Sequence, residues 1–360
     1  MKGITKYPGV EQTSYIAPAF FASYGLLLII YVLGRLEYSR ILITSSFLIN
    51  VLLFYCLNST FLRRRKMHIG IVPEGEYLAL SKVKGVEWTI LQSHDANVAH
   101  LNAISVDLRS DVSNEWERRL ANFALEGLPV YHSKHLLESL TGKVAIEHLS
   151  ENSFGTLSPL YAYMRIKRVV DFIAAVLALI ALFPALLVIG IMIAVDSRGP
   201  ILFRQVRIGY QGRPFRVFKF RTMVAEPKNE PVTTIEAAKT KDSDKRITRI
   251  GGFLRQSRLD ELPQILNVIK GEMSWIGPRP EAEVLSRWYE NEIPFYRYRH
   301  IVYPGITGWA QVNQGHVSEV NEVTSKLHYD FYYIKNFSPW IDVLIVMRTI
   351  RTMLTGFGAR

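Results

Sequence analysis

The 360-residue sequence has almost no cysteine: Cys56 is its only one, and it lies inside an apolar run. A single cysteine excludes an intrachain disulfide, a C-x-x-C redox pair and a cysteine zinc site. This scarcity is consistent with a soluble part that lies in the cytoplasm.

Two groups of ligand-binding motifs are also missing. The segment "IGIVPEGE" (69–76) has too few glycines for a G-x-G-x-x-G turn after a strand, so we do not expect it to bind a dinucleotide. Basic residues are frequent, yet no recognition-helix or RNP-type motif accompanies them. Nucleic acid is therefore not an expected partner.

Hydrophobic and basic residues are abundant instead. The chain is 49% hydrophobic with a mean hydropathy of +0.10, and its formal charge is +11. The hydrophobic share is high for a soluble protein, which indicates that part of the chain lies in lipid. Because apolar runs lie beside the positive charge, an anionic membrane surface and a phosphorylated substrate are the favoured partners.

Two apolar stretches, 16–34 and 41–62, occupy the N-terminal region, and each is near the length that crosses a bilayer. A cleaved signal peptide is not favoured, because the second stretch is apolar too and has a basic end. Residues 1–66 therefore predict a transmembrane hairpin, and two buried core helices are the alternative. Lysines before it and "RRRK" (63–66) after it place both ends in the cytoplasm.

Residues 67–150 contain short β-type runs that alternate with polar, helix-compatible segments. This alternation predicts a small Rossmann-like α/β domain with a parallel sheet. A packing or dimerisation module is favoured over a ligand site here, so a homodimer is one expected assembly. Residues 151–166 are expected to form a linker.

A third apolar stretch, residues 169–195, is long enough to span a membrane but contains Pro184 near its middle. Proline removes a helical hydrogen bond and clashes with the preceding turn, so the helix should bend. Charged residues flank both ends, at 167–168 and 196–198. The stretch is either a re-entrant helix that enters and leaves by the cytoplasmic face or a kinked spanning helix, and composition does not decide between them.

The segment "FRQVRIGYQGRPFRVFKFRTM" (203–223) predicts two strands around a "YQGRP" turn. Farther along, apolar residues at i, i+3, i+4 and i+7 predict a helix over 262–270 that Gly271 ends. Asp260 and Glu261 then lie at its N-terminal end, where the helix dipole favours the ionised carboxylate.

Two adjacent ionised carboxylates repel each other unless a cation lies between them, and hard oxygen ligands suit Mg²⁺. Arg255, Arg258 and Arg279 are close in sequence to Asp260 and Glu261. Acids, a divalent ion and arginines together predict phosphoryl chemistry. The alternative is an ordinary charge bias at a helix start, with surface ion pairs.

From about residue 165 to 360 the chain resembles the monotopic phosphoglycosyl transferases, the bacterial polyprenyl-phosphate sugar-1-phosphate transferases. The resemblance rests on a basic pair before a proline-broken apolar helix and on five motifs in the expected order, which are "GPILFRQVRIG", "FKFRTM", "RITRIGGFLR", "LDELPQILNVIKGEMSWIGPRP" and "YPGITGWAQVN". It implies an α/β membrane protein of the bacterial inner membrane. Its α+β catalytic domain would be residues 167–360, facing the cytoplasm.

The resemblance also implies the reaction. A UDP-sugar gives its sugar-1-phosphate to polyprenyl (undecaprenyl) phosphate in the lipid bilayer and leaves UMP, which initiates polysaccharide or glycoconjugate synthesis. By similarity, Asp260 is the nucleophile and Glu261, with Asp260, holds Mg²⁺. The expected phosphate-binding residues are Lys219, Arg221, Arg255 and Arg279.

Two features qualify this interpretation. Tyr303 stands where family members usually have a basic residue before "PGITG", and the C-terminal segment 328–354 either lies on the bilayer surface or packs on the catalytic core. The alternative function is a catalytically silent, membrane-anchored scaffold that binds a nucleotide sugar or an assembly partner. The intact Asp260, Glu261 and Arg279 argue against silence.

Overall fold

The computed structural model describes residues 13–57, 67–145, 159–224, 246–314 and 320–355. It divides into two compact units, Met1–Lys143 and Val144–Arg360, each of which is described by itself. The basic residues expected to orient the N-terminal hairpin, and much of the expected linker, lie outside the described residues.

Helices α1 (Thr13–Leu33) and α2 (Arg40–Leu57) form the first part of unit 1. They contact each other through a polar cluster in which the Tyr24 and Ser46 hydroxyls lie 2.6 Å apart and Asn50 donates to Tyr24. Large apolar side chains such as Leu33 remain exposed on both helices. Two apolar helices thus form where the sequence predicts them, with apolar surface left uncovered.

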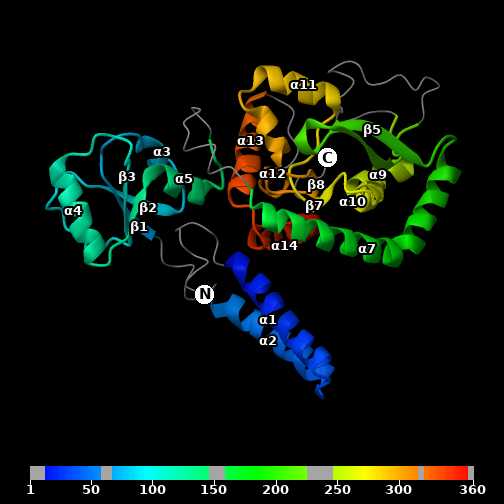
Figure 1. The fold of residues 1–360 in the computed structure, drawn as a ribbon, viewed down its shortest axis with the longest axis horizontal. Helices are drawn as coiled ribbons and strands as arrows, with labels where there is room; N and C mark the ends of the chain where they lie inside the picture. Colours follow the sequence, from blue (N-terminus) through cyan, green and yellow to red (C-terminus); the bar gives the residue numbers. More distant parts are fainter. Residues whose placement is uncertain (1–12, 58–66, 146–158, 225–245, 315–319, 356–360) are drawn as a thin grey trace. The chain divides into compact units, whose positions relative to one another are not determined.

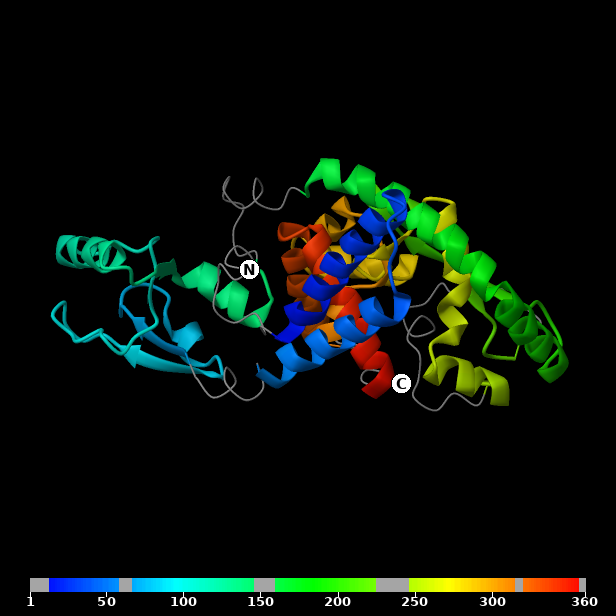
Figure 2. The same cartoon turned by 90° about the horizontal axis from the view of Figure 1, so that it is seen from below.

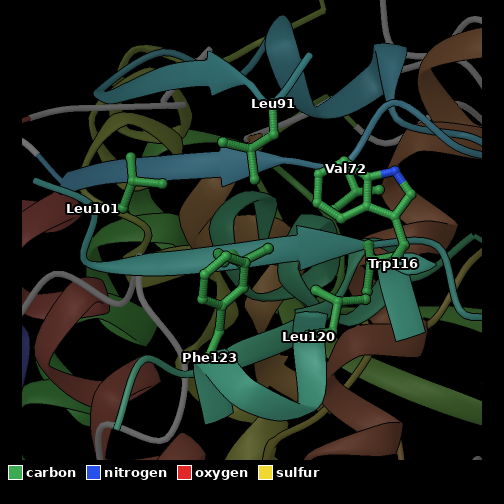
Figure 3. Packing of buried hydrophobic residues seen from close by; sticks show 8 residues of the cluster. Val72, Leu91, Leu101, Trp116, Leu120 and Phe123 are labelled. Atoms are coloured by element: carbon green, nitrogen blue, oxygen red, sulfur yellow. The ribbon is translucent and has the colours of Figure 1, made fainter. Parts of the chain in front are cut away.

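The second part of unit 1 is a parallel four-stranded sheet in the order β2-β1-β3-β4, as the sequence predicts. Its strands are β1 (Met67–Ile71), β2 (Val86–Ile90), β3 (Ala103–Val106) and β4 (Val130–His132), and its helices are α3 (Leu78–Ser81), α4 (Asn114–Leu125) and α5 (Ser133–Thr141). Figure 3 shows Trp116, Leu120 and Phe123 of α4 facing Leu91 and Leu101, and these residues belong to one buried cluster.

At the carboxyl edge of this sheet, Asp107 follows β3 and is 3% exposed. Its carboxylate accepts hydrogen bonds from the backbone N–H groups of Glu76 and Arg109, at 3.0 and 3.1 Å. In dinucleotide-binding folds the backbone donors at this edge bind phosphate. Here those of residues 76 and 109 are used by the chain itself.

Unit 2 begins with α7 (Tyr161–Asp196), which continues through Pro184 and changes direction along its length in Figure 1. At 36 residues it is long and apolar enough to cross a membrane, and few of its residues are buried. Figure 2 shows it along the edge of the unit.

Both ends of α7 are bonded to the same unit. Near its start, Ser274 Oγ donates to the Asp171 carboxylate at 2.6 Å. At its end, Arg221 Nη2 donates to the Ser197 carbonyl at 2.5 Å. Two buried clusters, around Ala175 and Ile193, pack the two halves of the helix on this unit.

The rest of unit 2 is an α+β arrangement. Strands β5 (Leu202–Ile208) and β6 (Pro214–Phe220) form the predicted antiparallel hairpin, and β7 (Ser274–Ile276) pairs with β8 (Gly305–Thr307). The helical elements are η2 (Tyr210–Gly212), α9 (Arg249–Gln256), η3 (Leu259–Gln264), α10 (Ile265–Ile269), α11 (Glu283–Glu292), η4 (Tyr296–Ile301), α12 (Trp309–Asn313), α13 (Val320–Lys335) and α14 (Pro339–Thr355).

Helix α14 forms the end of the C-terminal segment, which was expected either to lie on the bilayer surface or to pack on the catalytic core. Its residues Ile341, Leu344 and Ile345 are buried, so this face packs on the core. Trp340 and Ile350 remain 46% and 48% exposed, which leaves a second apolar face uncovered.

Candidate active site

The acid pair lies in a tighter helix than the sequence predicts. The expected α-helix over 262–270 is instead a 3₁₀ segment, η3 (Leu259–Gln264), followed by the short α10. Because the helical turn begins at Leu259, Asp260 and Glu261 lie inside its first turn rather than ahead of it. The preceding Arg258 has φ +58°, a left-handed conformation that turns the chain into η3.

Glu261 is 8% exposed and is bonded to two cations. Lys219 Nζ donates to its Oε1 at 2.7 Å. Arg279 donates from Nη2 to Oε1 at 2.5 Å and from Nη1 to Oε2 at 3.2 Å. Residues 219, 261 and 279 thus meet from β6, η3 and the loop after β7.

Burial and charge act in opposite directions on this cluster. Burial alone would raise the pKa of Glu261, but the charges of Arg279 and Lys219 outweigh it and hold that pKa well below its usual value. Glu261 in turn raises the pKa of Arg279. Burial lowers the pKa of Lys219 to about 8 although Glu261 opposes the change.

Asp260 differs from its neighbour. No hydrogen bond to its carboxylate is found within the described part of the chain, and burial raises its pKa, with Lys219 opposing the shift. At Asp260, burial therefore opposes the ionised form that a helix dipole would favour, whereas Glu261 is held ionised by its two cations. The structure places a paired carboxylate beside an unpaired one, which is the arrangement that lets two acids take different roles.

The other two predicted phosphate-binding arginines lie differently. Arg255 is near enough to Asp260 for its charge to lower that residue's pKa. Arg221 instead donates to Ser197 at the end of α7, and in the part of the chain that the structure describes it makes no hydrogen bond to Asp260 or Glu261. The structure thus gathers Lys219, Asp260, Glu261 and Arg279, with Arg255 close to them.

Sequence reasoning missed the residues that hold the loop of Arg279. Arg299 donates to the Arg279 carbonyl at 2.8 Å and pairs with Asp330, and both residues are buried. The available signal was a charge inside an aromatic segment, in "YRYRH" and in "HYDFYY". Such charges are rarely buried unless they are paired.

The predicted Mg²⁺ ligands can be tested against their chemistry. Among the described residues no group of three or more His, Cys, Asp or Glu side chains gathers as a metal site. Mg²⁺ often takes one or two carboxylates and completes its shell with phosphate oxygens and water. Asp260 is an open carboxylate of this kind, whereas both Glu261 oxygens already accept from cations. The donor set fits Mg²⁺ that arrives with a phosphate substrate.

Comparison with known proteins identifies the family. The family model described as bacterial sugar transferase matches residues 162–356. A relative from Aeromonas hydrophila is 44% identical over 99% of this chain and 83% of its own length. The chain belongs to the bacterial sugar transferase family. That relative is named UDP-N-acetylgalactosamine-undecaprenyl-phosphate N-acetylgalactosaminephosphotransferase.

Two further relatives match about half of the chain. Proteins from Xanthomonas campestris pv. campestris and Escherichia coli (strain K12) are 46% and 40% identical over 51% of this chain. Both are named UDP-glucose:undecaprenyl-phosphate glucose-1-phosphate transferase, and the match spans 37% and 39% of their lengths.

Proposed function

We propose that this protein transfers a sugar-1-phosphate from a UDP-sugar to undecaprenyl phosphate and releases UMP, as the first step of polysaccharide or glycoconjugate synthesis. The observation that carries the proposal is a pair of adjacent carboxylates with different surroundings. Within the described ranges Asp260 is unpaired, whereas Lys219 and Arg279 neutralise Glu261. Membership of the bacterial sugar transferase family supports it. No observation on the described residues favours a silent scaffold.

In the proposed first step, an Asp260 oxygen attacks the β-phosphorus of the UDP-sugar. A bond from that oxygen to phosphorus forms, the bond to the bridging oxygen breaks, and UMP leaves. A phosphate oxygen of the polyprenyl phosphate then attacks the same phosphorus. The aspartyl bond breaks, the carboxylate is regenerated, and a polyprenyl diphosphate sugar is released. A carboxylate nucleophile divides one difficult transfer into two easier ones.

The cations next to Asp260 would stabilise the transferring phosphoryl group. Lys219 and Arg279 form ion pairs with the adjacent Glu261, and the charge of Arg255 lowers the pKa of Asp260. Such preorganised donors stabilise charge that develops on phosphoryl oxygens. We propose that Asp260 binds Mg²⁺ together with the substrate phosphates. Glu261 would also bind the ion if Lys219 or Arg279 moved away from its carboxylate. The ion would supply further neutralisation of the phosphate charge.

The membrane arrangement is part of the proposal. Asp171 near the start of α7 and Ser197 just after its end both bond to unit 2, through Ser274 and Arg221. A straight spanning helix would place these two contacts on opposite sides of a bilayer. We therefore propose that α7 is re-entrant, that α1 and α2 span the inner membrane, and that the catalytic domain faces the cytoplasm.

The sugar is proposed from the relatives. The Aeromonas hydrophila protein covers nearly the whole chain, so UDP-N-acetylgalactosamine is the first candidate donor and UDP-glucose the second. The proposed homodimer remains a prediction from the α/β domain.

The test is a panel of radiolabelled UDP-sugars with purified protein, polyprenyl phosphate and Mg²⁺. Labelled lipid and stoichiometric UMP are expected for one donor, and EDTA should stop the reaction until Mg²⁺ is restored. If the nucleotide sugars bind but neither product forms with any donor, the scaffold function replaces the enzyme.

A further inference from the structure

The loop that carries Arg279 is held by its carbonyl groups. Pro278 and Pro280 have no backbone N–H, so this three-residue segment offers one donor and three acceptors. The Pro278 carbonyl accepts from Gly305 N at 3.0 Å. The other two carbonyls accept from guanidinium groups, that of Arg279 from Arg299 at 2.8 Å and that of Pro280 from Arg207 at 2.6 Å.

Arg299 is the more deeply buried of these two arginines, at 3% exposed. Its Nη1 donates to the Tyr296 hydroxyl at 2.7 Å. Its Nη2, the nitrogen that donates to the Arg279 carbonyl, also lies 2.8 Å from Oδ2 of Asp330 on α13. One nitrogen thus connects a buried carboxylate to the backbone of Arg279.

A buried ion pair of this kind is weak evidence for a role in fold stability. Removing two charges from water is expensive, and well-packed apolar residues often stabilise a core as well as a buried ion pair does. The presence of a buried charged pair is better explained by the group that the pair holds in place. Here it fixes the carbonyl, and hence the peptide plane, of the residue whose guanidinium binds Glu261 at two points.

We infer that Arg299, fixed by Asp330, is a positioning residue that sets the direction of the Arg279 guanidinium toward Glu261 and the transferring phosphate. The inference rests on the proposed function, because it assumes that Arg279 serves phosphate transfer. In the described structure Arg299 bonds to neither Asp260 nor Glu261, so it would act through the Arg279 backbone. A bidentate guanidinium contact depends on direction as well as on charge, so a small rotation of this peptide reduces it.

The test is a double-mutant cycle with Arg279→Lys, Arg299→Lys and the double variant. Lysine keeps a positive charge opposite Asp330, but its compact ammonium cannot reproduce the planar fork of arginine. Arg287→Lys is the matched control, because Arg287 is exposed and forms an ion pair with Glu283 one turn away on its own helix. Melting temperature and steady-state UMP release are measured on each preparation.

We expect Arg299→Lys to lower kcat by roughly tenfold to a hundredfold, as for loss of a hydrogen bond from a charged group, with a smaller change in KM for the UDP-sugar. Arg287→Lys should match the wild type. Because Arg299 acts through Arg279, the double variant should be no slower than Arg279→Lys alone, within about twofold. If Arg299→Lys does not fold, Asp330→Asn in the same cycle should give the same non-additive result.

Three results overturn the inference. Multiplied losses in the double variant would show that Arg299 acts independently, and a lowered melting temperature with normal kcat would make it a scaffold residue. A slow Arg299→Lys beside a normal Arg279→Lys would remove Arg279 from the chain of contacts. The proposed function fails separately, when the wild type makes no labelled lipid with any donor.

Discussion

Arg279 binds Glu261 at two points, with Nη2 on Oε1 at 2.5 Å and Nη1 on Oε2 at 3.2 Å. The same Oε1 accepts from Lys219. Glu261 is therefore an ionised anchor for two cations, while Asp260 next to it has a raised pKa and no such partner within the residues that the structure describes. The two adjacent acids should respond differently to the same chemical change.

Asp260→Asn should abolish transfer without unfolding the protein. The substitution keeps the side-chain shape and removes only the negative charge of the nucleophile. Among the described residues, Asp260 makes no buried ion pair that the fold would lose. The measurement is UMP release beside thermal melting, with the exposed Asp95→Asn as the control. Substantial turnover by pure Asp260→Asn would remove this residue from the nucleophile role.

Glu261→Gln should unfold more easily than Asp260→Asn. Removing the buried carboxylate leaves the partly buried charges of Lys219 and Arg279 without compensation, and breaking one side of a fully buried pair typically costs about 3–5 kcal/mol, which is the upper limit here. Urea unfolding of both variants measures the difference in the free energy of unfolding. Equal stabilities for the two variants would mean that the ion pairs around Glu261 contribute nothing to the fold.

Activity should fall as the pH rises through about 8. Burial lowers the pKa of Lys219 to about 8, so its positive charge is present below that pH and is lost above it. Loss of the charge weakens the cation cluster beside Asp260. A pH profile of kcat/KM should show this alkaline limb, and Lys219→Arg, if active, should move it to higher pH because a guanidinium stays charged. A kcat/KM profile that stays flat to pH 10 would contradict a role for the Lys219 charge in the reaction.

The two ends of α7 should face the same side of the membrane. In a Cys56→Ser background, Ile166→Cys and Arg198→Cys place one exposed cysteine on each flank of the apolar stretch. Both should be labelled only by a reagent that reaches the cytoplasm, and the Cys56→Ser parent is the blank. Periplasmic labelling of one flank alone would establish a spanning helix.

Local patterns predicted the elements well. The β5–β6 hairpin and the parallel sheet follow from alternating apolar residues and turn signals, which depend on neighbours in the chain. The start of η3 was missed, because the apolar spacing marks a helix from Leu262 whereas the turn begins at Leu259 as a 3₁₀ segment. A left-handed Arg258 starts it, and neither spacing nor propensity indicates that conformation.

The sequence proposes residues for the candidate site but not their geometry. Spacing and charge selected Asp260 and Glu261, and the resemblance added Lys219, Arg221, Arg255 and Arg279. Nothing local in the sequence says that Arg279 binds Glu261, or that Arg221 bonds to Ser197 at the end of α7 instead. The pairing depends on a close approach between β6, η3 and the loop after β7. The buried partner Asp330 lies farther along the chain, and such contacts follow from the fold rather than from a motif.

The most direct test of the account is the mass of the intact protein after mixing with the cognate UDP-sugar in the absence of polyprenyl phosphate. A carboxylate nucleophile predicts one equivalent of UMP and a mass increase of one sugar phosphate, located on Asp260 and absent from Asp260→Asn. Adding polyprenyl phosphate should remove the added mass and produce the lipid-linked sugar. Lipid product that forms only when both substrates are present, with no adduct and no UMP before the acceptor is added, would contradict the central claim.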